Sequence, residues 1–186
     1  MSIQLKKGHS FNLSKKELNL KKIMIGLGWE LKTTSLMDLD ASVFMLGGNG
    51  KLPADEFFVF YNNLKSPDGS IQHTGDNRTG AGEGDDEMIL ANLNLIDGRV
   101  SEILIVVTIH DAPARRQNFG LLNDAYIRLV DVETKREILN YDLDASFAKD
   151  TDVEFGKLQR LDGEWHFVAS GIGSTKGIEG YVEAYA

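Results

Sequence analysis

Short apolar runs separated by turn signals constrain the fold of this chain more than any other feature of its sequence. The clearest runs cover residues 22–31, 38–46, 100–109 and 122–132. The two-residue turn signals are Asn49-Gly50, Asp97-Gly98 and Asp162-Gly163. Such pairs are typical of hairpins that join antiparallel strands. Because almost no segment has helical periodicity, the pattern predicts an all-β sandwich or barrel with short helical turns.

The same pattern makes predictions for individual segments. Residues 102–110, EILIVVTIH, are the most β-branched part of the chain, and we expect them to form a central strand buried on both faces. The polar connection 111–120 has room for a helical turn, and residues 178–185 are expected to form a last strand. A chain of 186 residues fits one domain, residues 1–186, with a sizeable core.

An acidic segment at residues 68–87, DGSIQHTGDNRTGAGEGDDE, contains six carboxylates and five glycines against one cation, Arg78. Like charges at this density repel, and a hard divalent cation bound by oxygen atoms would neutralise them. The segment therefore favours a calcium-binding loop, while a solvated acidic connection without a ligand is the open alternative. It is not an EF-hand, because counting from Asp76 puts Arg78 and Gly80 at two ligand positions.

A short internal repeat carries further carboxylates. The pentapeptide DLDAS occurs at residues 38–42 and again at residues 142–146. Residues i and i+2 of a strand point to the same side, so Asp38 and Asp40 are expected to share a face. Because loops cluster at the ends of a sandwich, we expect both repeats and the acidic segment to converge at one end.

Charge and composition exclude several classes of protein. The net charge of −8 and the isoelectric point near 5.0 argue against nucleic acid as a partner, since phosphate binding rests on clustered Lys and Arg. The absence of Cys excludes disulfides and thiolate metal sites and suits a reducing compartment. No signal peptide or membrane span is recognisable, and the acidic segment has no apolar tip for direct membrane insertion. We therefore expect a soluble cytoplasmic protein.

Six segments resemble the TerD family of tellurium-resistance and stress proteins. They are GLGWE (26–30), DLDAS (38–42), FYNNLKSPDGSIQHTGDNRTGAGEGDDE (60–87), VVTIHDAPARRQNFG (106–120), NDAYIRLVD (123–131) and GEWHF (163–167). The long central segment is highly specific, and the resemblance covers nearly the whole chain. It implies a two-sheet β-sandwich that binds calcium through long acidic loops, with a role in resistance to tellurite, other chemical stresses and phage.

The resemblance also implies which residues bind calcium. Carried over by motif, the ligands are Asp38, Asp40, Asp68, Asp76, Asn77, Asp85, Asp86, Glu87 and Asp124. The internal repeat adds Asp144. This set exceeds one coordination sphere, so it requires two neighbouring calcium ions, or else some of these residues only support the ligands.

Two functions follow from these observations. The first is a non-catalytic, calcium-binding stress-response protein whose ordered loops present a surface to other stress-resistance proteins, including membrane-associated ones. The alternative is a metal-dependent phosphohydrolase or nucleotide-binding protein that uses the same loops. Its other candidate residues are His110, Asp111, Arg115 and Arg116. No nucleophile motif accompanies them, so we expect a protein that is not an enzyme.

Overall fold

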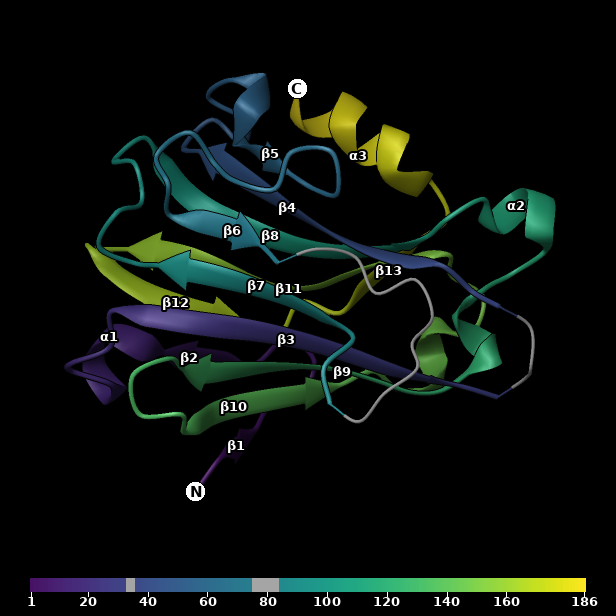
Figure 1. Ribbon diagram of the computed structural model, residues 1–186, viewed down its shortest axis with the longest axis horizontal. Helices are drawn as coiled ribbons and strands as arrows, with labels where there is room; N and C mark the ends of the chain where they lie inside the picture. The colour runs from purple at the N-terminus through teal and green to yellow at the C-terminus, as the bar shows by residue number, and fades with distance from the viewer. Residues whose placement is uncertain (33–35, 75–83) are drawn as a thin grey trace.

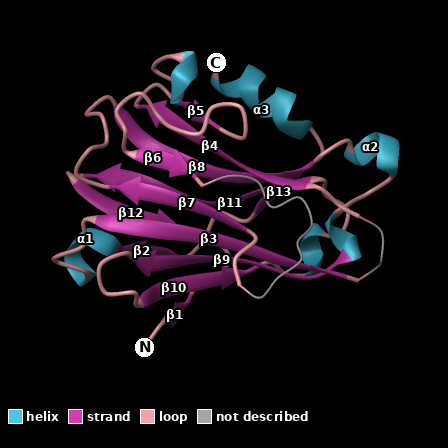
Figure 2. Ribbon diagram, in the orientation of Figure 1, coloured by secondary structure: helices cyan, strands magenta, loops and turns pink. Residues whose placement is uncertain are grey.

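The computed structural model describes residues 1–32, 36–74 and 84–186, whose strands form two sheets packed face to face (Figures 1 and 2). Sheet A has the strand order β1 (Ile3–Gln4), β10 (Glu137–Asp142), β9 (Leu122–Asp131), β3 (Lys22–Leu31), β7 (Glu87–Asn92) and β6 (Ile71–His73). Sheet B has the order β2 (Ser10–Asn12), β12 (Glu164–Val168), β11 (Asp152–Leu161), β8 (Val100–Ile109), β4 (Leu39–Gly47) and β5 (Phe58–Val59), and β13 (Ile172–Ser174) pairs with β11. The pairings are antiparallel except that of β1 with β10.

The main core lies between the two sheets. Alternate residues of the long central strands supply it and are fully buried, among them Ile23, Ile25 and Leu27 of β3 and Ile103, Ile105 and Val107 of β8. Because side chains alternate between the two faces of a strand, this spacing puts one apolar layer between the sheets. The predicted all-β, two-sheet sandwich is confirmed.

A C-terminal helix, α3 (Gly177–Tyr185), stands where the sequence predicted a last strand, so that prediction is wrong. Its apolar residues recur at helical spacing: Ile178, Tyr181, Val182 and Tyr185. They pack on the outer face of sheet B, against Phe44 of β4 and Leu104 of β8 (Figure 1). The strand β8 is therefore buried on both faces, as predicted.

The other described helices are single turns. They are α1 (Leu13–Lys16), α2 (Ala112–Arg115) and the 3-10 turns η1 (Asp55–Phe57), η2 (Phe119–Leu121) and η3 (Ala145–Phe147). The turn α2 confirms the expectation of a helical turn in the connection 111–120. None of the helices in the described ranges is long and apolar enough to cross a membrane.

The three turn signals have different outcomes. Asp162 and Gly163 join β11 to β12 with φ angles of 51° and 78°, which are typical of a type I′ hairpin turn. The signal Asp97-Gly98 does not close a hairpin, because β7 belongs to sheet A and β8 to sheet B. After Asn49-Gly50 the chain passes through η1 before β5 pairs with β4, so this connection is longer than a two-residue hairpin.

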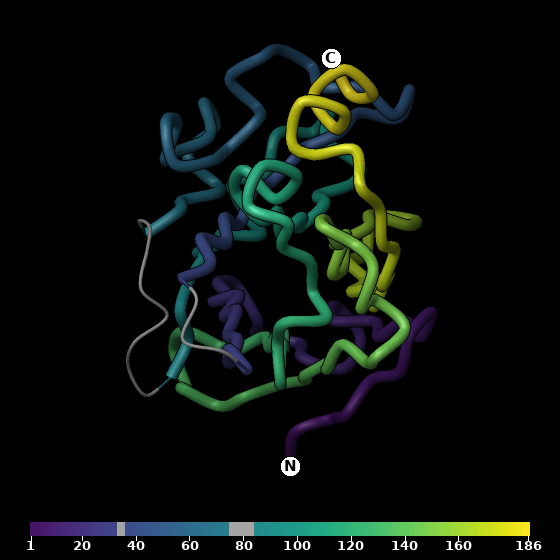
Figure 3. The backbone as a smooth tube through the Cα atoms, turned by 90° about the vertical axis from the view of Figure 1, so that its right-hand side faces the viewer, coloured from purple at the N-terminus to yellow at the C-terminus, as the bar shows by residue number. Residues whose placement is uncertain are grey.

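One end of the sandwich gathers the start of β4, β7 and β9 and the end of β3, β6 and β8. Figure 3 looks onto this end, from which α2 projects. We call it the acidic end, because Asp38, Asp40, Asp86 and Glu87 lie there. The sequence predicted such a gathering of acidic residues.

Candidate metal centre

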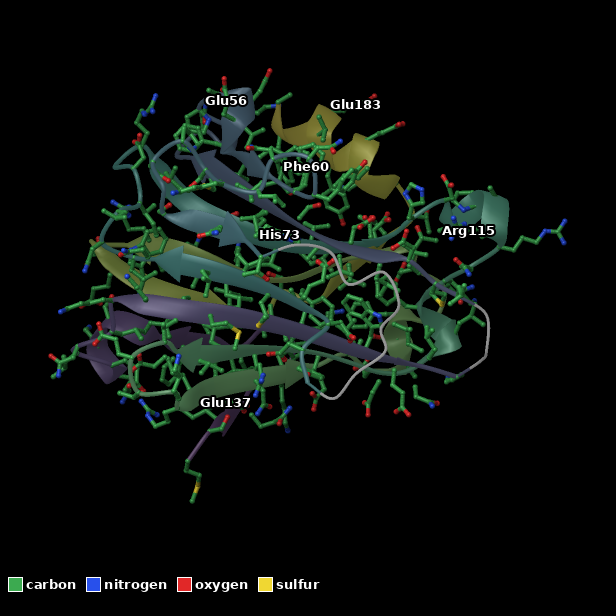
Figure 4. All side chains as sticks on the ribbon, viewed as in Figure 1. Glu56, Phe60, His73, Arg115, Glu137 and Glu183 are labelled. Atoms are coloured by element: carbon green, nitrogen blue, oxygen red, sulfur yellow. The ribbon has the colours of Figure 1, made fainter. Side chains whose placement is uncertain are left out.

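Glu87, the first residue of β7, points inward and links the two sheets. Its Oε2 accepts a hydrogen bond of 2.8 Å from the backbone N–H of Ala41 on β4. The same oxygen lies 3.3 Å from Nε2 of His73, the last residue of β6, and both side chains are only 1 % exposed. Figure 4 marks the position of His73 at the end of β6. A carboxylate is thus buried where the edges of sheets A and B meet.

Asp86 is buried against the neighbouring strand, β3. Its backbone N–H donates to the carbonyl of Leu27 over 2.7 Å, and its Oδ2 accepts from the N–H of Trp29 over 2.8 Å. Burial raises the pKa of this carboxyl, the bond from Trp29 opposes the rise, and the neighbouring charge of Asp85 adds to it. The charged form of Asp86 therefore lacks stabilisation that a nearby cation would supply.

Asp38 and Asp40 lie at the start of β4, on the other side of the junction between the sheets. The carbonyl of Asp38 accepts a bond of 2.8 Å from the N–H of His110, which fixes the backbone at this point. The Asp38 Oδ1 atom is buried and makes no hydrogen bond within the described part of the chain. A buried oxygen without a donor is costly, and a bound cation is one way to stabilise it.

Asp85 points to the outer face of sheet A, away from Glu87. Its carboxylate forms an ion pair with Arg128 of β9, with Oδ2 2.8 Å from Nη2, and accepts a bond of 2.9 Å from the Tyr126 hydroxyl. The three consecutive acids at residues 85–87 therefore occupy different environments. Asp85 is neutralised by an arginine, whereas Asp86 and Glu87 are buried near the junction of the sheets.

Asp68 lies at the opposite end of sheet A, contrary to the expectation that all acidic clusters converge. The neighbouring Ser70 carbonyl accepts a bond from Asn92, the last residue of β7, whereas the acidic end is at the start of β7. The Asp68 Oδ1 accepts bonds from the Ser66 and Ser70 hydroxyls and from the Ser70 N–H, and Oδ2 accepts from the N–H of Asp97 over 2.9 Å. Its role is to hold these two connections together.

Asp124 and Asp144 line a separate cavity of about 130 Å3. Lys32 lines the same cavity and donates from Nζ to the Gly120 carbonyl over 3.1 Å. Asp144 also caps η3, because its Oδ1 accepts from the N–H of Ser146 over 2.8 Å. Bonds from the Ser146 side chain and N–H lower the pKa of Asp144. One cationic side chain therefore lines this cavity together with the two acidic ones.

The predicted ligands Asp76 and Asn77 lie outside the described residues. Within residues 1–32, 36–74 and 84–186, no three His, Asp or Glu side chains are placed to hold a metal ion by themselves. The donors that the acidic end does offer are hard oxygen atoms, which suit calcium. The carboxylates of the acidic end therefore suit a calcium ion chemically, and the buried Oδ1 of Asp38 lacks a partner that such an ion would provide. An ion at this place would need further ligands to complete its coordination.

Sequence reasoning gave no role to His73, although it contacts Glu87. The sequence feature that indicates a buried His73 is its spacing from Ile71. The two residues are separated by one position in a short strand, so both side chains point to the inner face. The residues of the enzyme alternative lie on α2 and next to it: His110 Nε2 is 3.3 Å from Asp111 Oδ2, and Arg115 points into solvent (Figure 4). None of these four residues lines the cavity of about 130 Å3 that Asp124 and Asp144 share.

Comparison with known proteins covers the whole length of the chain. A family model described as the TerD domain matches residues 1–185. A tellurium resistance protein TerD of Alcaligenes sp. is 47 % identical over 187 residues, which cover 100 % of this chain and 97 % of the relative. General stress protein 16U of Bacillus subtilis is 44 % identical over 96 % of this chain and 94 % of its own. A crystal structure of a Streptomyces coelicolor homologue of the telluride resistance protein aligns with a TM-score of 0.72 and 20 % identity, covering 90 % of this chain and 99 % of that chain.

Proposed function

This chain belongs to the TerD family of tellurium-resistance and stress-response proteins, and from that premise we propose that it is a non-catalytic protein that binds calcium at its acidic end. The ion would lie near the junction of β4 and β7. Its ligands in the described residues would come from Asp38, Asp40, Asp86 and Glu87, completed by Asp76 and Asn77 of the acidic segment.

The observation that carries this proposal is the buried Oδ1 of Asp38, which has no hydrogen-bond donor among the described residues. Asp86 adds a second carboxylate whose charged form is disfavoured by burial. A cation at this position would offset both costs, and the ligand chemistry favours calcium. Calcium takes about six to eight oxygen ligands in flexible geometry, whereas magnesium usually keeps several waters.

We propose one ion at this position instead of two. A second ion would have to use the cavity that Asp124 and Asp144 share. Lys32 also lines this cavity, and its ammonium bonds to the Gly120 carbonyl. An additional cation there would be repelled by that ammonium, and Asp144 Oδ1 already accepts bonds from the N–H and the hydroxyl of Ser146. Asp124 and Asp144 are therefore left out of the proposed ligand set.

Bound calcium would neutralise the acidic end and order its loops, and this would create a surface for other stress-resistance proteins, including membrane-associated ones. The partner surface is tested by recovering proteins from a lysate with calcium and with a chelator. We expect some partners only with calcium. The same set under both conditions would contradict this part of the proposal.

The calcium site is tested by calorimetric titration of chelator-stripped protein with calcium and, separately, with magnesium. We expect saturable calcium binding in the natural protein and a loss of affinity of about tenfold or more in Asp38→Asn, since a ligand charge is removed. Asp124→Asn is the matched control, because it makes the same change of charge outside the proposed site, and its affinity should stay unchanged. Natural protein that is folded and does not bind at millimolar calcium would overturn the proposal.

A further inference from the structure

Asp85 is one of three consecutive acids at the end of the acidic segment, and the geometry points to a different role for it. We propose that Asp85 is not a calcium ligand but the anchor that positions Asp86 and Glu87 at the acidic end. This inference rests on the proposed calcium site. It concerns how the protein holds the ligands in place before an ion arrives.

Both carboxylate oxygens of Asp85 are used by β9. Oδ1 accepts from Tyr126 and from Arg128 Nε, each over 2.9 Å, and Oδ2 accepts from Arg128 Nη2 over 2.8 Å. The Asp85 side chain is 3 % exposed, and Arg128 is 33 % exposed. Burial, followed by the bond to Asp85, raises the pKa of Tyr126 to about 12, so its hydroxyl remains a donor. Two-point pairing of this kind fixes orientation as well as charge.

Two glycines of β3 provide the space for this arrangement. A Cβ at Gly26 would lie 2.3 Å from Oδ2 of Asp85, and a Cβ at Gly28 would lie 2.3 Å from the ring of Tyr126. Side chains at either position would displace the carboxylate or the ring. The GLGWE segment therefore leaves a recess on the outer face of sheet A that the Asp85 carboxylate fills.

The anchor acts on the neighbouring residues through the backbone. With Asp85 held on the outer face of β3, the next N–H donates to Leu27 and the Asp86 carboxylate reaches the N–H of Trp29. Glu87 then pairs with Leu27 in the ladder between β7 and β3 and points inward. Loss of the anchor should therefore make Asp86 and Glu87 less ordered, although this loss removes no oxygen atom that binds the ion.

A ligand role for Asp85 makes the opposite prediction for Arg128. A guanidinium 2.8 Å from Oδ2 opposes a calcium ion at the same oxygen, so removing Arg128 would free a ligand and strengthen binding. If Asp85 is an anchor, removing Arg128 breaks the anchor and weakens binding. The sign of the effect of one substitution therefore separates the two roles.

The experiment titrates calcium into Asp85→Asn, Arg128→Gln and the double variant. We expect each single variant to lose about tenfold in affinity, because residues must be ordered on binding, and the double variant to lose no more than either single one. Arg115→Gln is the matched control, since it removes the same charge from an exposed site at the acidic end, and it should bind as the natural protein does. Calcium binding by Arg128→Gln that equals or exceeds that of the natural protein would overturn the proposal.

A second measurement needs no calcium and separates failure of the anchor from failure of the calcium site. Amide hydrogen exchange in the presence of chelator should become faster at Trp29 and Asp86 in both single variants. The reason is that the Trp29 N–H donates to the Asp86 carboxylate and the Asp86 N–H donates to a carbonyl of β3, and both bonds depend on the anchored segment. If Arg128→Gln does not fold, Tyr126→Phe removes one bond to Asp85 and should give a smaller change in the same direction. Unchanged exchange in folded variants would show that Asp85 is no anchor, whether or not the natural protein binds calcium.

Discussion

Whether the charge of an acidic residue is stabilised in this protein depends on its hydrogen-bond donors, not on its position in an acidic segment. Asp68 is an example. Burial alone would raise its pKa, but the bonds from Ser66, Asp97 and Ser70 together outweigh burial and lower it. Its charge is therefore already stabilised without a metal ion, in contrast to that of Asp86.

Asp68→Asn should lower the free energy of unfolding at pH 7 by about 1–3 kcal/mol, because a charged acceptor of several bonds is lost. A pKa that is lower in the folded than in the unfolded protein contributes stability above the unfolded value of 3.8, and this contribution is lost as the pH falls through the folded value. The difference between the variant and the natural protein should therefore shrink below about pH 4. Urea denaturation at pH 7 and at pH 3 measures it.

Asp162→Asn is the control for this substitution, since Asp162 is exposed and Asn tolerates its positive φ angle of 51°. The control should change stability by less than about 0.5 kcal/mol at either pH. A destabilisation by Asp68→Asn that is the same at pH 7 and pH 3 would contradict an effect of the carboxylate charge.

At the scale of elements, the sequence predicted the features that neighbouring residues determine, such as turns, but not the pairing of distant strands. The turn at Asp162-Gly163 is local, because the two residues alone favour the backbone angles of the hairpin. The signal at Asp97-Gly98 could not reveal that β7 pairs with β3 and β8 with β4 and β11, since these partners are distant in the chain. The same limit explains why Asp68 was expected at the acidic end.

Helix α3 was missed for a different reason. Tyr181, Glu183 and Tyr185 alternate as in a strand, whereas Ile178, Tyr181, Val182 and Tyr185 also fit a helix. What decides between the two patterns is the apolar outer face of β4 and β8, against which only the helical arrangement places all four side chains. This face exists only once β4 and β8 are paired in the folded protein. The sequence of residues 178–185 alone therefore could not show that a helix packs there.

Tyr181→Ala should destabilise the protein by about 2–5 kcal/mol and reduce its helical signal, because Tyr181 is 2 % exposed and fills the cluster between α3 and sheet B. Chemical denaturation followed by circular dichroism measures both quantities. Tyr61→Ala, at a residue that is 50 % exposed, is the matched control and should cost far less. Equal stability of the two variants would mean that α3 contributes little to the fold.

At the scale of the whole molecule, the proposed calcium site lies where the two sheets meet. Glu87 of sheet A already bonds to Ala41 of sheet B, and Asp38 approaches from the start of β4. An ion bound by these residues would connect both sheets and would bind only the folded protein. The sandwich was predictable from strand patterns, and a gathering of acidic residues at one end was predictable from the clustering of loops. Which acidic residues meet there depends on the pairing of strands far apart in sequence.

Calcium should therefore raise the melting temperature of the whole domain, and not only order a loop. At a calcium concentration of about 100 times Kd, a ligand specific for the folded state adds about 2.7 kcal/mol of stability. For a chain of this length, that corresponds to a rise in Tm of about 5–11 °C, measured by calorimetry with calcium against chelator. With a tenfold loss of affinity, Asp38→Asn should reduce the rise at the same calcium concentration to about half, whereas Asp124→Asn should keep it. A calcium-independent Tm in a protein that binds calcium by titration would mean that the unfolded chain binds the ion as tightly as the folded protein does, because a ligand specific for the folded state must raise Tm. That result would contradict a site that is assembled from both sheets only on folding.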